Sequence, residues 1–283
     1  MTTLLFVTGA SRGLGRSFSI ALTQKYFEKY AAGRVALKIV LLARSDEGLQ
    51  ETERQIYASV DDDDNQQQLC IERHIIDLGD LETLDADLSV ILDPLKGAGY
   101  DETILINNAG SLGDLQTISA LPSLGSMQSA IDFNVTSACW VTSKFVKIFD
   151  ESITEEIASK NTKTTIVNIS SLCAVQPFKT CSVYCTGKAA RDMFHATLAA
   201  ENTNVRVLNY APGPCDTDMQ TSMRESETID GDIKAFFRKS KEEGSIVVPT
   251  QSAQCLSRLV FGDMEFESGS HVDYFDISGS TIE

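Results

Sequence analysis

The stretch Leu4-Leu5-Phe6-Val7-Thr8-Gly9-Ala10-Ser11-Arg12-Gly13-Leu14-Gly15 decides the fold. Its apolar start predicts a short buried strand, three glycines follow, and a helical pattern then runs from 16 to about 30. Glycines at these places allow a tight turn and a close approach of the backbone to phosphate and ribose groups. The start of the helix adds free N–H groups and a partial positive charge. The spacing Gly-x-x-x-Gly-x-Gly therefore predicts a dinucleotide site, with a glycine-rich turn that binds nothing as the alternative.

Beyond this stretch, apolar runs alternate with helical patterns through all 283 residues. The alternation predicts an α/β fold: one Rossmann-type domain over 1–283, with a doubly wound parallel sheet and helices on both faces. Its ligand should lie beyond the carboxyl ends of the strands, where the strand order reverses. Strands are expected at 4–8, 37–43, 69–76, 103–107, 164–170, 205–211 and 271–273, and helices at 13–30, 46–58, 81–92, 123–150, 182–201 and 250–260.

Two segments do not fit the alternation. Residues 215–247 are polar and charged with isolated apolar points, and we interpret them as short helices that form a lid over the substrate. The acidic run from Asp61 to Asp64, followed by Asn65 and three glutamines, predicts a solvated loop.

A second motif carries chemistry. Tyr184 and Lys188 are four residues apart, so a helix places them side by side on one face. An ammonium beside a phenol lowers the phenol's pKa from about 10 toward working pH, which suits a general acid that protonates a carbonyl oxygen. Ser171 follows a predicted strand, and its hydroxyl could hydrogen-bond the same oxygen. Without a dinucleotide site, the pair would more simply mark a surface helix.

The end of the second expected strand bears on the choice of cofactor. NAD sites tend to carry an acidic residue there, which binds the ribose 2′-OH. Here Arg44 occupies that region and Arg12 lies in the glycine loop, and two guanidinium groups suit the 2′-phosphate of NADP(H). The alternative is that both are solvated surface arginines. Asp46 lies nearby but could cap the next helix.

Composition excludes several classes of function. The net charge of −16 argues against nucleic acid or an anionic membrane as a partner. No apolar run approaches the ~20 residues of a membrane span. The first expected strand leaves no room for a signal peptide, so a cytoplasmic protein is expected. Seven cysteines without Cys-x-x-Cys spacing predict reduced thiols, and three isolated histidines predict no metal site.

Taken in order, the motifs resemble those of the short-chain dehydrogenase/reductase family: Thr8-Gly9-x-x-x-Gly13-x-Gly15, Asn107-Asn108-Ala109-Gly110, Asn134, Ser171, Tyr184-x-x-x-Lys188 and Pro212-Gly213. The segments Asp216-Thr217-Asp218-Met219-Gln220 and Ser268-Gly269-Ser270-His271-Val272-Asp273 resemble the branch that reduces pterin ketones. The resemblance implies NADPH-dependent reduction of side-chain carbonyls of sepiapterin or a pyruvoyl pterin, in tetrahydrobiopterin synthesis. Alternatives are a reductase of other small carbonyl or dicarbonyl compounds, a dehydrogenase of hydroxy compounds, and, more remotely, a non-catalytic dinucleotide sensor.

The resemblance also assigns roles. Tyr184 is the implied proton donor, Lys188 lowers its pKa and bonds the nicotinamide ribose, Ser171 polarises the carbonyl, and Asn134 holds a water. Implied cofactor contacts are Gly9, Ser11, Arg12, Gly13, Leu14, Gly15, Arg44, Ser45, Asp77, Leu78, Asn107, Ala109, Gly110, Tyr184, Lys188, Cys215, Thr217, Asp218, Met219 and Gln220. Implied substrate contacts are Ser171, Leu172, Tyr184, Gly213 and Asp273, with Asp273 anchoring the pterin ring.

Simpler structural roles remain open for three of these residues. Asn134 could mark a helix bend, Asp77 could cap the helix expected near Leu81, and Asp273 could be a salt-bridged tail residue. The resemblance also implies a homodimer, formed through the helices expected at 123–150 and 182–201.

Overall fold

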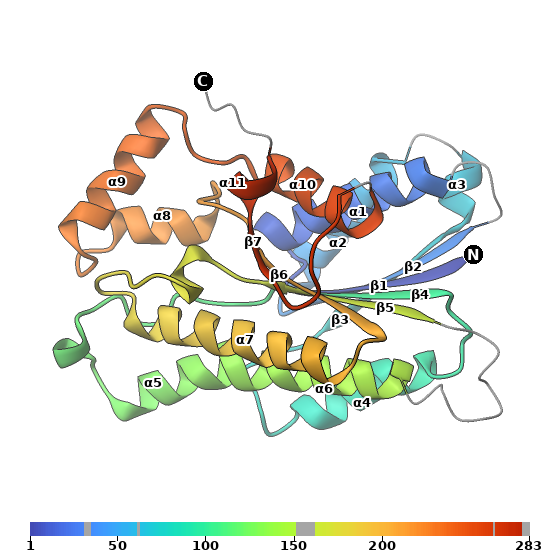
Figure 1. Ribbon diagram of the computed structural model, residues 1–283, viewed down its shortest axis with the longest axis horizontal. Coiled ribbons are helices and arrows are strands. Elements are labelled where there is room, and N and C mark those ends of the chain that lie inside the picture. Colours follow the sequence, from blue (N-terminus) through green and yellow to red (C-terminus); the bar gives the residue numbers. More distant parts are fainter. Residues whose placement is uncertain (31–34, 61–62, 151–161, 263, 279–283) are drawn as a thin grey trace.

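One parallel sheet organises the molecule. The computed structural model describes residues 1–30, 35–60, 63–150, 162–262 and 264–278. Within them, seven strands pair in the order β3-β2-β1-β4-β5-β6-β7 (Figure 1). The strands are β1 (Thr2–Thr8), β2 (Ala36–Ala43), β3 (Leu69–Ile75), β4 (Glu102–Asn107), β5 (Lys163–Ile169), β6 (Val205–Ala211) and β7 (His271–Asp273). The predicted fold class is confirmed, and each expected strand is present within two residues at either end.

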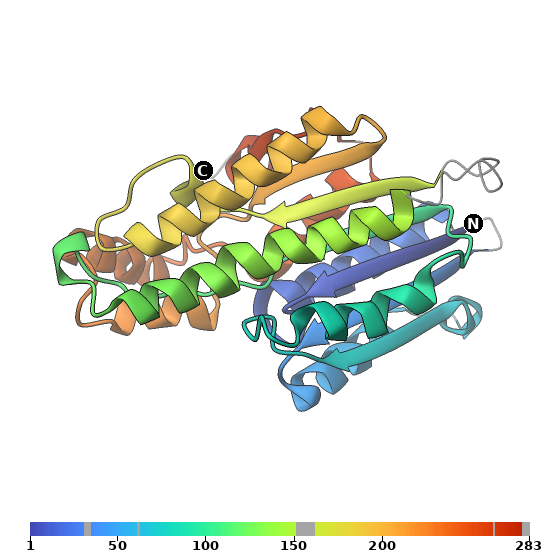
Figure 2. The same cartoon turned by 90° about the horizontal axis from the view of Figure 1, so that it is seen from below.

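Helices cover both faces of the sheet (Figures 1 and 2). One face carries α1 (Gly13–Tyr30), α2 (Asp46–Ala58) and α10 (Pro249–Phe261); the other carries α4 (Leu84–Leu92), α6 (Ser137–Asp150) and α7 (Ser182–Glu201). Phe18 and Leu256 are fully buried on the first face, and Leu88 and Phe145 on the second. Each such burial contributes about 1.5–3 kcal/mol. Because both faces are covered, the central strands β1, β4, β5 and β6 are buried at nearly every position, whereas the edge strand β3 exposes Cys70, Arg73 and Ile75.

The helix expected at 123–150 is interrupted. α5 (Leu124–Ile131) runs into a π-helical turn at Asp132–Thr136, and α6 follows. A π turn is rare and often occurs at a functional site. It places Asn134 where its Oδ1 accepts the Ser111 N–H at 2.8 Å and its Nδ2 donates to the Ser111 Oγ at 3.3 Å. The expectation of one unbroken helix is therefore wrong, and the interruption aims Asn134 at the segment after β4.

Two further boundaries differ from expectation. α4 begins at Leu84 rather than near 81, because the Asp77 and Asp80 carboxylates accept the N–H groups of Gly79 and Glu82 and hold the chain in turns. Asp61 and Asp62 lie outside the described residues. Where a loop was expected to continue, α3 (Asp63–Gln67) is a short helix, and its acidic first turn suits the positive end of the helix dipole.

Residues 215–247 contain the two short helices that the sequence suggested. α8 (Asp218–Glu225) and α9 (Gly231–Glu242) lie at one end of the molecule, beyond the carboxyl ends of the strands (Figure 1). Met223 and Phe237 are buried there against Leu115 and Cys181. The other helices within the described ranges are α11 (Tyr274–Ile277) and 3-10 turns at Asp93–Leu95, Ile118–Ala120 and Leu172–Ala174. No helix in the described part of the chain is long and apolar enough to cross a membrane.

Candidate active site

The glycine loop leads from β1 into α1 and leaves no room for a side chain at Gly9 or Gly15. Gly9 and Gly13 have φ of +66° and +54°, which L-residues rarely adopt. A Cβ on Gly15 would lie 2.2 Å from the Gly9 carbonyl oxygen, and one on Gly9 would lie 2.8 Å from the Asn108 Nδ2. Asn108 is itself fixed, because its Nδ2 donates to the Thr8 carbonyl at 2.9 Å. The backbone at the start of α1 is therefore exposed to whatever fills the space above it, as a dinucleotide site requires.

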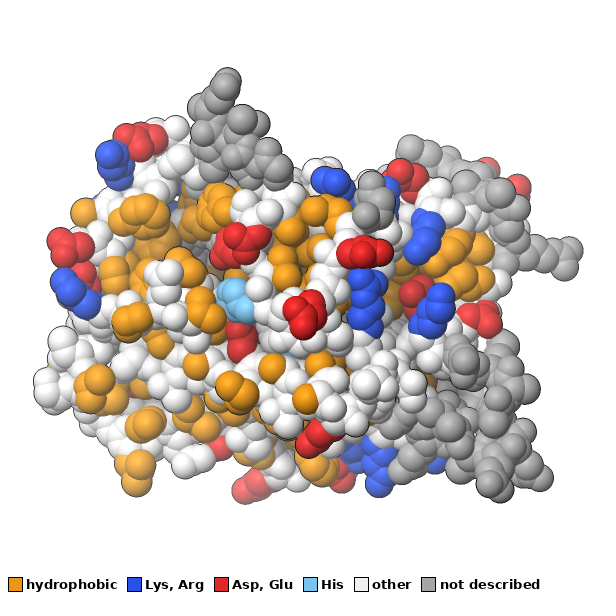
Figure 3. Space-filling view, viewed as in Figure 1, with side chains coloured by type: hydrophobic (Ala, Val, Ile, Leu, Met, Phe, Trp, Pro, Cys, Tyr) orange, Lys and Arg blue, Asp and Glu red, His pale blue; other side chains and the backbone are white. Residues whose placement is uncertain are grey.

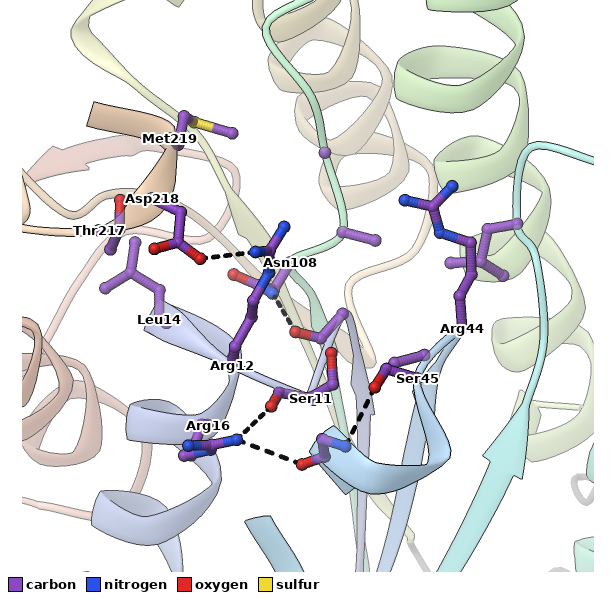
Figure 4. Close-up of a pocket in the computed structure, with 18 of the residues that line it drawn as sticks. Ser11, Arg12, Leu14, Arg16, Arg44, Ser45, Asn108, Thr217, Asp218 and Met219 are labelled. Atoms are coloured by element: carbon purple, nitrogen blue, oxygen red, sulfur yellow. Dashed lines mark hydrogen bonds and ion pairs between the residues drawn. The ribbon is translucent and has the colours of Figure 1, made fainter. Parts of the chain in front are cut away.

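A cavity of about 670 Å³ occupies that space (Figure 4). It extends from the glycine loop past the ends of β2, β3 and β4 to the start of α8. The expected cofactor residues that line it are Gly9, Ser11, Arg12, Gly13, Leu14, Gly15, Arg44, Ser45, Leu78, Ala109, Gly110, Thr217, Asp218 and Met219. The volume falls in the range of cofactor sites. The tight glycine turn and the two arginines at this cavity fit a dinucleotide phosphate group.

The two expected phosphate-binding arginines are available for a ligand. Arg12 Nη1 lies 2.5 Å from the Asp218 carboxylate, and Arg44 Nη1 lies 3.8 Å from that of Asp77 (Figure 4 draws Arg12, Asp218 and Arg44). Both arginine side chains are 72% exposed, and such surface pairs contribute only about 0–1 kcal/mol. An anionic ligand can therefore compete for either guanidinium at little cost. Arg16, which the motifs did not single out, donates to the Ser11 and Gly48 carbonyls and ties the loop to α2.

Three residues have structural contacts that the sequence did not indicate. Asn107 is buried, and its amide donates to the Ala138 carbonyl and the Thr142 hydroxyl, so it lines neither cavity. Asp77 also lines neither cavity, and it does not cap α4, since its Oδ1 accepts the Gly79 N–H. Ser45, rather than Asp46, caps α2 by accepting the Gly48 N–H at 3.1 Å.

A second cavity, of about 380 Å³, adjoins the first. The two share Leu14, Asn108, Gly110, Thr217 and Met219. The expected catalytic, substrate and remaining cofactor residues that line it are Ser171, Leu172, Tyr184, Lys188, Gly213, Cys215, Gln220 and Asp273. Asn134 lines neither cavity and lies behind Gly110, where a Cβ would come 3.4 Å from its Oδ1 and 3.8 Å from the Lys188 Nζ. The fold thus brings the two motif groups to two adjoining cavities.

Tyr184 and Lys188 face the second cavity from the same side of α7. The Lys188 Nζ lies 5.6 Å from the Tyr184 ring centroid and donates to the Ile169 carbonyl at 2.6 Å. The Ser171 hydroxyl accepts the Cys173 N–H at 3.2 Å, so the end of β5 is held in place. Across the cavity, the Tyr184 hydroxyl contacts the Met219 sulfur at 4.0 Å, which brings α8 of the segment 215–247 to the reactive groups.

Burial dominates the acid–base properties of the pair. Loss of water raises the pKa of Tyr184, while the Ser171 hydroxyl and the charge of Arg191 oppose the rise. Loss of water also holds the pKa of Lys188 well below its usual 10.5. In the protein by itself the pKa of Tyr184 is thus raised rather than lowered toward working pH, because desolvation by burial is the largest influence on it. The part that Lys188 plays in lowering it stays a prediction. A phenol with a raised pKa keeps its proton at neutral pH, as a proton donor must.

Asp273 begins α11 and lines the second cavity. Its Oδ1 accepts the Phe275 N–H at 2.9 Å, its backbone N–H donates to the Asp276 carboxylate, and burial raises its pKa. It forms no ion pair with another described residue, so the alternative of a salt-bridged tail residue loses its support. The described part of the chain also contains no group of three or more His, Cys, Asp or Glu that could hold a metal ion.

The wall of the second cavity is aromatic, which the motifs did not reveal. Its aromatic residues, besides Tyr184, are Phe178, Phe236, Phe237 and Phe275. Hydrophobic side chains gather around a hollow at the α9 end of the molecule (Figure 3). In the sequence, Phe236 and Phe237 are apolar residues within the polar segment 215–247, and this contrast could have indicated their place in a binding site. Phe275 gave none, because its place depends on β7 pairing with β6.

The fold and the two adjoining cavities are those of a dinucleotide-binding protein of the α/β class. Residues 3–228 match the family model described as short chain dehydrogenase. The chain belongs to the short-chain dehydrogenase/reductase family, whose members use a nicotinamide dinucleotide. The chain is therefore an oxidoreductase, and the alternative of a non-catalytic dinucleotide sensor does not hold.

Known relatives span nearly the whole chain. It is 40% identical over 271 residues to sepiapterin reductase of Meriones unguiculatus, covering 95% of each chain. It is 30% identical to benzil reductase ((S)-benzoin forming) of Bacillus subtilis, covering 91% of this chain and 93% of that protein. A 3-oxoacyl-acyl-carrier protein reductase from Brucella melitensis, solved in complex with NAD, superposes with a TM-score of 0.72 over 100% of this chain and 99% of its own, at 20% identity. The last likeness concerns the fold alone.

Proposed function

We propose that the protein is an NADPH-dependent reductase of side-chain carbonyls of a pterin. One observation carries the proposal: a single cavity holds the Ser171 and Tyr184 hydroxyls together with the Asp273 carboxylate. The two hydroxyls can donate hydrogen bonds to a carbonyl oxygen. A carboxylate accepts two N–H donors at once, such as the amino and ring N–H groups of a pterin. The similarity to sepiapterin reductase supports the same substrate class.

In this proposal, the chain's own residues position the reactants and move one proton. The glycine loop, Arg12 and Arg44 hold the cofactor's phosphates, and Thr217 and Met219 lie where the two cavities meet. When bound, the reduced nicotinamide supplies a hydride. Tyr184 donates its proton to the carbonyl oxygen, and Ser171 stabilises the charge that develops there. The Lys188 amine, held by the Ile169 carbonyl, lies beside Tyr184 and can return a proton to it.

The preference for NADPH rests on Arg44, and we expect Arg44→Ala to lower the NADPH/NADH ratio of kcat/KM more than about tenfold. The loss of one charge-assisted contact, about 1.5–3 kcal/mol, accounts for a change of this size. Arg54→Ala is the matched control, because Arg54 is an exposed arginine of α2 that pairs with Glu51 and does not line the cavity. An unchanged cofactor ratio in Arg44→Ala would contradict the assignment of Arg44.

Asp273→Asn tests the pterin assignment. The amide oxygen keeps the cap on the Phe275 N–H but removes the charge, so we expect the pterin KM to rise about 10–100-fold while KM for a plain diketone barely changes. Asp276→Asn is the control, since Asp276 is exposed on the same short helix and does not line the cavity. Equal effects of Asp273→Asn on both substrates would remove the pterin assignment and leave the reductase chemistry intact.

A second candidate is a reductase of bulky aromatic carbonyl or dicarbonyl compounds. The aromatic wall formed by Phe178, Phe236, Phe237 and Phe275 favours it, and so does the similarity to benzil reductase. Aromatic rings pack well against such walls without any need for Asp273. Steady-state kinetics with sepiapterin, a pyruvoyl pterin and benzil, each with NADPH and NADH, separate the two candidates. A pterin reductase shows its highest kcat/KM with a pterin.

A further inference from the structure

Arg191 is a fully buried cation one turn beyond Lys188 on α7. Its Nε donates to the Asn168 Oδ1 at 2.7 Å, its Nη1 donates to the Ala109 carbonyl at 2.8 Å, and its Nη2 donates to the Asn107 carbonyl. Among the described residues, no carboxylate forms an ion pair with it. The guanidinium therefore joins α7, the end of β5 and the segment that follows β4.

Such a placement has a large energetic cost. A guanidinium without a carboxylate partner loses its hydration on burial and recovers only part of it from neutral acceptors. Burial lowers the pKa of Arg191 to about 10, so it stays charged at neutral pH. The acceptors it holds lead directly into Asn108, Ala109 and Gly110, which line the dinucleotide cavity. A leucine or methionine would fill a helix–sheet contact without this cost, so the charge points to a role in the site.

We propose that Arg191 is a positioning residue of the reductase site, which clamps the segment after β4 against α7 and sets the electrostatic potential at Tyr184 and Lys188. The clamp keeps Ala109 and Gly110 at the wall shared by cofactor and substrate. The potential favours the negative charge that develops on the carbonyl oxygen and on Tyr184 as the proton leaves. The catalytic part of the inference rests on the reductase function proposed above; the clamp does not.

Other ionisable groups lie near Arg191, Lys188 and Tyr184. On α7, Asp192 bonds His271 of β7, and His195 is buried with its pKa lowered to about 4 by loss of water. Cys139 of α6 and Cys173 after β5 are thiols whose pKa burial raises to about 11 and about 12. Among these described groups, Arg191 is the buried guanidinium beside the pair, and the negative charge of Asp192 raises the pKa of both Lys188 and Arg191. The charge of Arg191 lowers the pKa of both Lys188 and Tyr184, so its removal raises both.

The clamp is tested in the ligand-free protein by hydrogen exchange of the backbone amides of 108–111. We expect Arg191→Met to speed their exchange about tenfold or more, since the lost hydrogen bonds hold the segment closed. Arg191→Lys keeps a charge but cannot reach three acceptors, so it should also speed exchange. Arg206→Met is the control, because Arg206 stacks on Phe266 near the amino end of β6. If exchange of these amides is unchanged in both Arg191 variants, Arg191 does not hold the segment in place. If the methionine variant does not fold, unchanged exchange in Arg191→Lys leads to the same conclusion.

The electrostatic role is tested by the pH dependence of alcohol oxidation with NADP⁺. In this direction Tyr184 must accept a proton, so the rate rises with pH as the Tyr184–Lys188 pair deprotonates. Arg191→Met should move the inflection to higher pH, whereas Arg191→Lys should leave it near the wild-type position. A merely structural residue would lower the rate at every pH and shift nothing. If the pH–rate profiles of Arg191→Met and Arg191→Lys have the same inflection, the electrostatic role of Arg191 is wrong. Arg191→Gln replaces Arg191→Met as the neutral variant if the methionine variant does not fold.

The two tests remain informative if the pterin assignment fails. The alcohol product of any carbonyl compound that the wild-type enzyme reduces can serve in the pH experiment. A wild-type enzyme that ignores pterins but shows the exchange and pH effects contradicts the proposed substrate only. Normal pterin reduction without either effect contradicts the role of Arg191 only.

Discussion

Tyr184→Phe should lower kcat/KM for carbonyl reduction about 10²–10⁴-fold, the usual contribution of a general acid. Its hydroxyl faces the second cavity, in contact with Met219 across it. Burial raises the pKa of Tyr184, so the wild-type donor keeps its proton across neutral pH and reduction should not decline there. Binding of NADPH, followed by fluorescence titration, should be nearly unchanged, because the ring stays and only the hydroxyl is lost.

The matched control for this variant is Tyr57→Phe. Tyr57 belongs to α2, is partly buried and lines neither cavity, so its hydroxyl should not matter for turnover. Full turnover in Tyr184→Phe would remove Tyr184 as the acid. Lost NADPH binding in the same variant would instead show that the hydroxyl supports the cofactor site.

Gly15→Ala should abolish most cofactor binding and reduce activity about 10²-fold or more, even though alanine is normally the better residue within a helix. The added Cβ would lie 2.2 Å from the Gly9 carbonyl oxygen and 2.7 Å from the Asn108 Nδ2, so the loop has to move. The movement displaces the N–H groups at the start of α1. Overpacking of this kind also destabilises a protein by about 1–3 kcal/mol or more, which thermal unfolding measures.

Gly125→Ala provides the comparison. Gly125 lies in the first turn of α5, and the atom nearest to a Cβ added there would be the Ser123 Oγ, at 3.8 Å. That substitution should leave both NADPH affinity and the unfolding midpoint at or slightly above wild type. An NADPH affinity of Gly15→Ala equal to that of Gly125→Ala would mean that the cofactor does not use the glycine loop.

Local patterns predicted the fold well because its central strands are buried on both faces. The strands β1 and β5 are buried at nearly every position and each contains an apolar run, Leu4 to Val7 in β1 and Ile166-Val167 in β5. The glycine loop and the Tyr184–Lys188 pair each lie within a few residues of sequence. The ends of helices could also be predicted from the local sequence where a side chain caps the helix. Such features need no knowledge of distant contacts.

Features set by distant contacts could not be predicted in the same way. The π turn around Asn134 depends on Ser111, which is 23 residues away in sequence. The choice between Asn107 and Asn108 as the cavity residue depends on which side chain faces α6. The direction of the Tyr184 pKa shift depends on how much water the folded chain excludes, and sequence spacing carries no information about that.

A crystal structure with NADP⁺ and an unreactive carbonyl analogue would show whether Tyr184 and Ser171 act on the substrate's carbonyl oxygen. We expect the analogue's carbonyl oxygen in the second cavity, within hydrogen-bond distance of both the Tyr184 and Ser171 hydroxyls, and the nucleotide in the cavity above the glycine loop. A carbonyl bound elsewhere, or a nucleotide that leaves that loop uncovered, would contradict this expectation.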